Sequence, residues 1–230
     1  QARPRLRAPR LTQKNYNVPA RGAPEKTRAL EIKMRRQLWK AAGEQVKASN
    51  MYRFMQRVNR GRGLALGDYR GLYRWSVEKP EEFWGELWSF LGVKSSKPYT
   101  SVVDDIKKFP GARWFCGAEL NYAENILANG DPSSPAIIFR GESGVRRELS
   151  HADLRDQVKR FAAALRAEGV GPGDAVAAYM PNMPETVIAM LGTAAVGALW
   201  CSCATDIGAG AAVDRLGQIK PKVLVTADGY

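Results

Sequence analysis

The pattern of apolar and polar positions is clearest between residues 170 and 208, where two short apolar runs flank a segment with helical spacing. The runs Ala175–Met180 and Ala198–Cys203 have the length of buried strands. Between them, Thr186–Val196 has apolar side chains at helical spacing and is followed by Gly197, a residue that commonly ends helices. A strand, a helix and a strand in this order predict a βαβ unit with parallel strands in a helix-covered sheet.

A membrane span is the alternative interpretation of the same stretch. Residues 186–205 carry no charge, and about 20 apolar residues suffice to cross a bilayer. The stretch is rich in Ala, Gly, Thr and Ser rather than Leu and Ile, and Gly197 marks a turn in its middle. A buried helix followed by a buried strand therefore explains the pattern better.

Further elements are predicted on both sides of this unit. Ala136–Phe139 and Arg146–Leu149 flank a glycine-containing turn and predict a β-hairpin. Ser150 and Asp153 form a capping box before a helix that ends at Gly169 and carries an apolar face of Leu154, Val158, Phe161, Ala162 and Leu165.

Two more elements are expected after residue 208. Residues 209–219 predict a helix with Val213, Leu216 and Ile219 on its apolar side. Pro221 ends that helix, and Val223–Ala227 predicts a third parallel strand.

The first half of the chain predicts helices rather than strands. Helical spacing runs through Glu25–Asn59, stops at a glycine- and arginine-rich break over Gly61–Gly71, and resumes over Leu72–Gly92. The second helical segment is dense in large aromatic side chains, which we interpret as core packing rather than as a ligand site. Ser101–Cys116 is expected to be irregular, and a short helix is expected within Trp114–Leu127.

The formal net charge of +12 is unevenly distributed. Residues 1–63 hold 17 Lys and Arg against 3 acidic residues, whereas residues 64–230 hold 18 against 20. Residues 1–36 are therefore expected to be a basic, disordered leader. The charge of Gln1–Pro24 is similar to that of a transit peptide, but this stretch lacks serine and apolar periodicity. Because the chain does not begin with Met, we expect it to be incomplete or processed.

Cysteine and histidine usage narrows the classes of chemistry. Cys116, Cys201 and Cys203 give no even disulfide framework, and Cys201 and Cys203 lie in an apolar run that indicates core thiols. His151 is the single histidine, which argues against a Cys/His zinc site and a histidine-dependent triad. We expect no metal site and a reducing, cytoplasmic location.

Few motifs in the sequence point directly to chemistry. Neither GxGxxG nor GxxxxGK[ST] is present. Asp206-Ile207-Gly208 follows a predicted parallel strand, in the kind of loop where such sheets bind ligands. The alternative is a helix-capping loop, and position alone does not separate the two. Asp174 and Asp228 are interpreted as turn residues.

Several longer motifs indicate a family. They are YRWSVEKPEEFWGELWSFLGV at residues 73–93, WFCGAELNYAENIL at 114–127, GDAVAAYMPNMPE at 173–185, GALWCS at 197–202 and DRLGQIKPKVL at 214–224. Together they resemble the acyl-adenylate-forming acyl-CoA synthetases that act on short carboxylic acids. The tetrad Tyr122–Asn125 is most similar to the acetoacetyl-CoA synthetase branch. The resemblance covers about residues 37–230.

The resemblance implies a ligase that uses ATP, CoA and Mg²⁺ to convert acetoacetate to acetoacetyl-CoA in two steps. It places Ser202, Thr205, Asp206 and Gly208 in a loop near the CoA and acyl channel. Here the loop departs from the family's usual Ser-Ser-x-Ser-Pro-Asp-Phe-Gly, although Asp206 and Gly208 match. The family's phosphate loop, ribose-binding Asp and lysine-bearing C-terminal domain would lie beyond Tyr230. We therefore expect no catalytic residue here, and an isolated chain that is inactive and prone to aggregate.

The expected fold class is α/β, in three parts. After the leader come a helical, aromatic-rich cap over residues 37–130 and the start of the AMP-binding α/β domain over 131–230, with the boundary in the linker Asp131–Pro135. The expected partner is a small-molecule substrate, without membrane or nucleic acid. Two alternatives stay open: an acetyl- or propionyl-CoA synthetase, and a non-enzymatic module that binds nucleic acid through its basic residues.

Overall fold

The computed structural model describes residues 39–229. They divide into two compact units, one that ends at Arg53 and one that begins at Phe54. Helix α2 (Gly43–Ala48) lies in the first unit, and helix α3 (Asn50–Arg62) begins there and continues into the second.

The helical segment predicted over residues 25–59 is two helices in its described part, α2 and α3. Ser49 has an extended backbone between α2 and α3, and its Oγ accepts a hydrogen bond from the backbone N–H of Tyr52 at 3.2 Å. A serine that bonds its own neighbouring backbone competes with a continuous helix and caps a new one instead. Helix α3 also runs through Gly61, where a break was expected. Residues 25–38 lie outside the described residues.

The helical segment predicted over 72–92 is two helices. Helix α4 (Tyr69–Glu78) and helix α5 (Pro80–Leu91) are separated at Lys79, whose backbone is not helical. Pro80 causes the break, because a proline disfavours helical geometry in the preceding residue while suiting the first turn of the next helix.

Aromatic side chains form the core of this helical region, as predicted. Phe54, Val58 and Trp75 are buried, and the Phe83 ring packs edge-on against both Phe54 and Trp75 at 5.6 and 5.5 Å between centroids. Leu72 completes the buried cluster. Packing within α3, α4 and α5 thus explains part of the aromatic density, whereas Tyr69, Tyr73 and Trp84 are exposed.

The segment 101–116, expected to be irregular, contains two strands. Strands β1 (Ser101–Val103) and β2 (Trp114–Cys116) pair antiparallel, with Ser101 opposite Cys116. Each strand has three residues, which is too short for alternation of apolar and polar positions to be visible in a sequence.

The predicted short helix is α6 (Tyr122–Leu127). Two asparagines, one just before it and one within it, connect distant parts of the second unit. Asn121 accepts a hydrogen bond from the Glu124 backbone N–H and thereby caps α6, while its Nδ2 donates to the Ala194 carbonyl at 2.8 Å. Asn125 bonds both the N–H and the C=O of Lys94, at 2.8 and 2.9 Å. Each amide therefore uses its donor and its acceptor at once.

The hairpin and the capping box are confirmed. Strands β3 (Pro135–Arg140) and β4 (Arg146–Ser150) pair antiparallel. Helix α7 (His151–Ala167) begins with the capping box of Ser150 and Asp153 and buries Leu154, Val158, Ala162 and Leu165.

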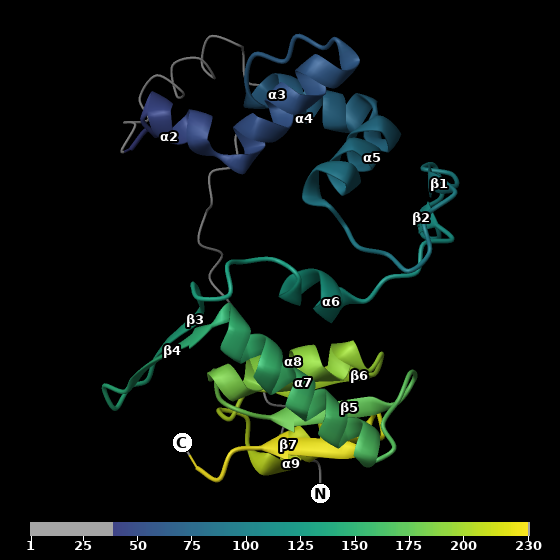
Figure 1. Ribbon diagram of the computed structural model, residues 1–230. Coiled ribbons are helices and arrows are strands. Elements are labelled where there is room, and N and C mark those ends of the chain that lie inside the picture. The colour runs from purple at the N-terminus through teal and green to yellow at the C-terminus, as the bar shows by residue number, and fades with distance from the viewer. Residues whose placement is uncertain (1–38, 230) are drawn as a thin grey trace, which may run out of the picture. The chain divides into compact units, whose positions relative to one another are not determined.

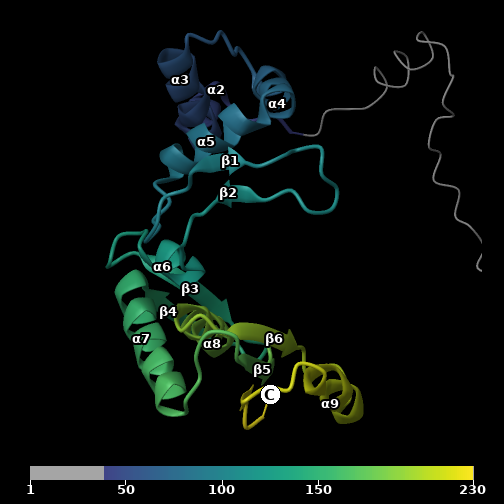
Figure 2. The same ribbon diagram turned by 90° about the vertical axis from the view of Figure 1, so that its right-hand side faces the viewer.

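The βαβ unit and the third strand are also confirmed. Strand β5 (Ala175–Tyr179), helix α8 (Pro184–Ala195), strand β6 (Leu199–Cys203), helix α9 (Ala209–Gly217) and strand β7 (Val223–Thr226) follow in that order. The strands form a parallel sheet in the order β6-β5-β7. Since the crossover from β5 to β6 and the crossover from β6 to β7 run in opposite directions along the sheet, the right-handed rule places α8 and α9 on opposite faces. Figures 1 and 2 show α7 and α8 on one side and α9 on the other.

The two faces of the sheet differ in how well they are covered. We call them the α8 face, which α7 and α8 cover, and the α9 face. On the α8 face α7 and α8 approach closely: a Cβ on Gly192 would lie 2.7 Å from Phe161. On the α9 face, Leu199 and Leu224 are 60% and 56% exposed. The predicted helix-covered sheet is thus covered completely only at β5, whose first four residues are buried.

The predicted apolar side of α9 is partly wrong. Ala212 and Leu216 are buried, whereas Val213 is 73% exposed and Ile219 lies beyond the end of the helix. The spacing of apolar residues alone did not identify the buried side of α9, because Ala212 and Val213 are neighbours and either of them can belong to an apolar stripe.

The membrane-span alternative is not supported. Residues 186–205 form parts of a helix and a strand rather than one helix, and no helix among residues 39–229 is long and apolar enough to cross a bilayer.

Candidate functional site at the carboxyl edge of the sheet

All three parallel strands end at the same edge of the sheet, so the loops that follow them lie together. These loops are residues 180–183 after β5, 204–208 after β6, and 227–229 after β7. In open parallel sheets, ligands bind in the loops beyond the carboxyl ends of the strands. The topology therefore makes this edge the candidate site.

The structure gathers three of the four residues predicted for the site into one turn. Thr205 is half-buried, while Asp206 and Gly208 are exposed, in the loop that leads into α9. Ser202 is exposed within β6 and lies on the α8 face, opposite Ala178 in the register. The turn thus exposes the side chain of Asp206 at the carboxyl edge of the sheet.

The helix-capping alternative is confirmed for the loop, which supplies the N-cap of α9, but Asp206 is not the capping residue. The N-cap of α9 is Gly208, and no side chain caps it. The backbone N–H groups of Ala211 and Ala212 instead donate to the Gly208 carbonyl, at 3.0 and 3.1 Å. The carboxylate of Asp206 is therefore not used to cap this helix.

One contact of this loop was missed by sequence reasoning. The Tyr179 hydroxyl, at the end of β5, lies 3.1 Å from the Thr205 carbonyl and 2.5 Å from the Ile207 carbonyl. The backbone N–H of Met180 adds a bond to the Cys203 carbonyl at 3.3 Å. The one sign of this contact in the sequence is a tyrosine at the end of a strand of otherwise small residues.

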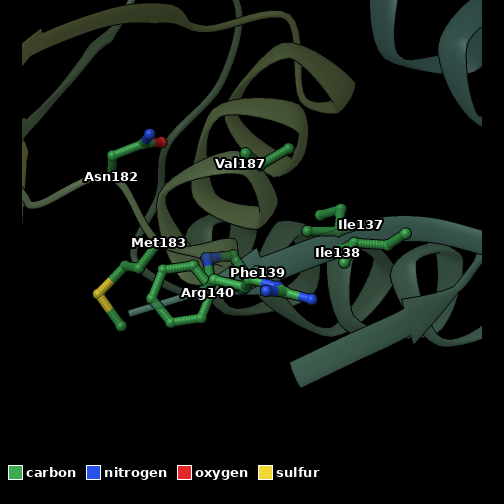
Figure 3. Close-up of a pocket in the computed structure, with 8 residues that line it drawn as sticks. Ile137, Ile138, Phe139, Arg140, Asn182, Met183 and Val187 are labelled. Carbon is green, nitrogen blue, oxygen red and sulfur yellow. The ribbon is translucent and has the colours of Figure 1, made fainter. Parts of the chain in front are cut away.

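A groove lies beside the loop that follows β5. Its volume is about 260 Å³, and it lies between strand β3 and the start of α8. Figure 3 shows Phe139 and Arg140 next to Met183, with Asn182 and Val187 above them. The lining residues are Ile137, Ile138, Phe139, Arg140, Asn182, Met183, Pro184 and Val187. With one cation, one amide and no carboxylate or thiol, the lining offers packing and hydrogen bonds rather than acid–base or nucleophilic chemistry.

An ion pair fixes the hairpin to the start of α8 near this groove. Both Arg147 terminal nitrogens donate to the Glu185 carboxylate at 2.7 Å, and the Arg147 guanidinium lies 5.3 Å from the Phe139 ring centroid. The hydrogen bonds from Arg147 lower the pKa of Glu185 and raise the pKa of Arg147. This bidentate pair orients the β5–α8 connection.

The two aspartates predicted to be turn residues lie at opposite edges of the sheet. Asp174 precedes β5 at the amino edge, where its carboxylate pairs with Lys222 at 2.8 Å and accepts from the Gly171 N–H at 2.9 Å. Lys222 and then Gly171 lower the pKa of Asp174. Asp228 lies in the bend after β7, at the carboxyl edge.

Metal chemistry has no visible support among residues 39–229. They contain no group of three or more His, Cys, Asp or Glu side chains that could hold a metal ion. Cys116, Cys201 and Cys203 are free and half-buried, so the two strand thiols are less enclosed than predicted.

Two family models match consecutive parts of the chain. Residues 69–126 match the acetyl-coenzyme A synthetase N-terminus, and residues 126–229 match the AMP-binding enzyme family.

Individual relatives point in the same direction. The chain is 43% identical over 195 residues to the acetoacetyl-coenzyme A synthetase of Rhizobium meliloti. That match covers 85% of this chain and 30% of that protein. It is 38% identical to the malonamoyl-CoA synthetase of Penicillium aethiopicum, over 82% of this chain and 27% of that protein. The solved acetoacetyl-CoA synthetase of Streptomyces lividans has a TM-score of 0.79 at 42% identity, and the match covers 85% of this chain and 31% of that one. The chain thus spans about a third or less of the length of these relatives. The matches identify it as a homologue of the N-terminal part of acetoacetyl-CoA synthetases.

Proposed function

We propose that this chain is the N-terminal part of an ATP-dependent acetoacetate–CoA ligase. The observation that supports the proposal is the 38–43% identity to relatives, most of them acetoacetyl-CoA synthetases, over most of the chain. The reaction is acetoacetate + ATP + CoA to acetoacetyl-CoA + AMP + pyrophosphate.

The proposed reaction proceeds in two displacements. A carboxylate oxygen of acetoacetate attacks the α-phosphorus of ATP, which forms an acyl-adenylate and releases pyrophosphate. The CoA sulfur then attacks the acyl carbon, AMP leaves with the electron pair of the broken C–O bond, and the thiol proton passes to solvent. Mg²⁺, when bound, would neutralise phosphate charge. No residue described in this chain is assigned to that ion.

Within this chain we assign Ser202, Thr205, Asp206 and Gly208 to the wall of the CoA and acyl channel. Their place at the carboxyl edge of a parallel sheet supports the assignment. Hydroxyl groups and the backbone of an uncapped turn can bond the amides of a pantetheine arm, and Asp206 can accept a hydrogen bond from it.

We further propose that the phosphate-binding and acid–base groups belong to parts of the enzyme outside these 230 residues. The absence of a glycine-rich phosphate motif from the sequence supports this. On this proposal residues 1–36 are a leader, 37–130 a cap, and 131–230 the start of the AMP-binding domain. The two family models meet at residue 126, close to the proposed boundary. Three free cysteines are consistent with a cytosolic enzyme.

The experiment compares the complete gene product that contains this chain with residues 1–230 alone. Each is incubated with ATP, Mg²⁺, CoA and one acid: acetoacetate, malonamate, acetate or propionate. We expect the complete product to form AMP and a thioester fastest with acetoacetate, and the isolated chain to form neither. A preference for another acid would overturn the substrate assignment, and acyl-adenylate formed by residues 1–230 would overturn the division of the site.

A further inference from the structure

Tyr179 is the one side chain of β5 that reaches the loop after β6. It is the last residue of its strand and lies on the α9 face, opposite Cys203 in the register. The four strand residues before it, Ala175–Ala178, are small and fully buried, so the strand ends with a ring that extends beyond the sheet.

The hydroxyl of Tyr179 meets the loop at two backbone carbonyls. Its oxygen lies 2.5 Å from the Ile207 carbonyl and 3.1 Å from that of Thr205. A tyrosine hydroxyl has one hydrogen, so it donates to one of these oxygens at a time. Both acceptors belong to the turn that contains Asp206, so this hydroxyl holds the backbone of that turn on either side of Asp206.

The loop also forms a hydrogen bond within itself, since the Ile207 N–H lies 3.4 Å from the Ala204 carbonyl. At its end, Gly208 has no side chain with which to cap α9. The Tyr179 hydroxyl therefore links this turn to strand β5 at two of its carbonyls.

We infer that Tyr179 is a positioning residue for the thioester-forming step. It holds the turn that presents Asp206, so that the carboxylate of this residue meets the pantetheine arm of CoA. The inference rests on the proposed function. It predicts that Tyr179 affects the KM for CoA but not the activation of acetoacetate by ATP. The reason is that the Tyr179 hydroxyl contacts this turn and no residue that we assign to ATP.

The experiment uses the complete gene product and the variant Tyr179→Phe, which keeps the ring and removes the hydroxyl. Two quantities are measured: the KM for CoA in thioester formation, and acetoacetate-dependent exchange of pyrophosphate into ATP. We expect the KM for CoA to rise about tenfold, the effect of one lost hydrogen bond. Pyrophosphate exchange should stay within twofold of the wild type.

A second readout follows the loop itself. Amide hydrogen exchange at residues 205–208 should become about tenfold faster in Tyr179→Phe, while exchange at Val176 in the buried strand stays unchanged. The matched control is Thr186→Val, which removes a hydroxyl bond of 2.7 Å to the Pro181 carbonyl in the neighbouring loop. This control should leave both the KM for CoA and exchange at 205–208 unchanged.

Three results would overturn the inference. They are unchanged exchange at 205–208, faster exchange with an unchanged KM for CoA, and an equal loss of pyrophosphate exchange and thioester formation. The proposed function is tested separately in the wild type: if the wild-type protein activates none of the acids, that function has failed, whatever Tyr179→Phe does.

Discussion

The two faces of the β6-β5-β7 sheet are built from the same three strands but differ in how they are closed. The α8 face is covered by two helices, with Gly192 allowing α8 to approach Phe161. The α9 face has one nine-residue helix, and leaves Leu199 and Leu224 more than half exposed. Stability is therefore concentrated on the α8 face, and the α9 face leaves apolar surface uncovered among the described residues.

The largest expected difference between the faces comes from truncating a leucine. Leu191 in α8 is 2% exposed, so Leu191→Ala should lower the free energy of unfolding by about 3 kcal/mol, through lost burial and a cavity. Leu224→Ala on the α9 face should cost less than about 1 kcal/mol, since most of that side chain is in water. Urea unfolding of the chain at low concentration, followed by circular dichroism, measures both. Equal losses would contradict the distinction between the faces.

The next largest difference in stability is expected between a glycine substitution in α8 and one in α9. Gly192→Val places atoms against Phe161 and should cost about 2 kcal/mol through overpacking. The matched control is Gly210→Val in α9, where an added Cβ meets nothing within 4 Å, and it should change stability by less than about 0.5 kcal/mol. Thermal unfolding of both variants checks this. A tolerated valine at position 192 would show that α7 and α8 can move apart.

A smaller, pH-dependent effect comes from the ion pair of Arg147 and Glu185. Arg147 lowers the pKa of Glu185 in the folded state, so the contribution is full above the ordinary carboxyl pKa, about 4.3, and is lost as pH falls through the folded value. Both side chains are about 40% exposed, which limits the effect to about 0.5–1 kcal/mol.

The measurement is urea unfolding at pH 7 and at about pH 3. Glu185→Gln should lose less stability than the wild type over this interval. Asp156→Asn, which breaks a more exposed pair with Arg160, should follow the wild type. A wild-type chain whose pH dependence is unchanged by Glu185→Gln would show that this pair contributes nothing.

The smallest effect on folding is expected where the α9 face is made polar. The double substitution Leu199→Lys and Leu224→Lys should change the free energy of unfolding by less than about 1 kcal/mol. It should nevertheless reduce self-association of the isolated chain several-fold, because it removes exposed apolar surface next to two edge strands. Light scattering against concentration measures this. Equal association of variant and wild type would mean that aggregation begins elsewhere.

Much of the parallel sheet was predictable from the sequence because its signals are local. The small apolar run of β5, Pro184 at the start of α8 and the capping box of Ser150 each act through residues close in the chain. Strands β1 and β2 were not predictable, because each is three residues long and they pair across a ten-residue loop. The division between α4 and α5 could have been predicted from Pro80.

The candidate site was predicted only in part. The sequence placed Thr205, Asp206 and Gly208 in one loop, and they do share a turn. Whether these residues contact CoA stays a prediction. Tyr179 could not have been found by spacing, because its contact with residues 205 and 207 spans more than 25 positions and exists only once β5 and β6 pair in register.

The side-chain amide of Asn121 has a consequence for how family signatures are understood. It accepts from Glu124 and donates to Ala194, 73 positions away. An aspartate has nearly the same shape but, when ionised, nothing to donate, and it would set a negative charge against a carbonyl oxygen. Residues 121–125 therefore join distant segments of the chain, so a sequence motif at this place has a structural role without any contact to a substrate.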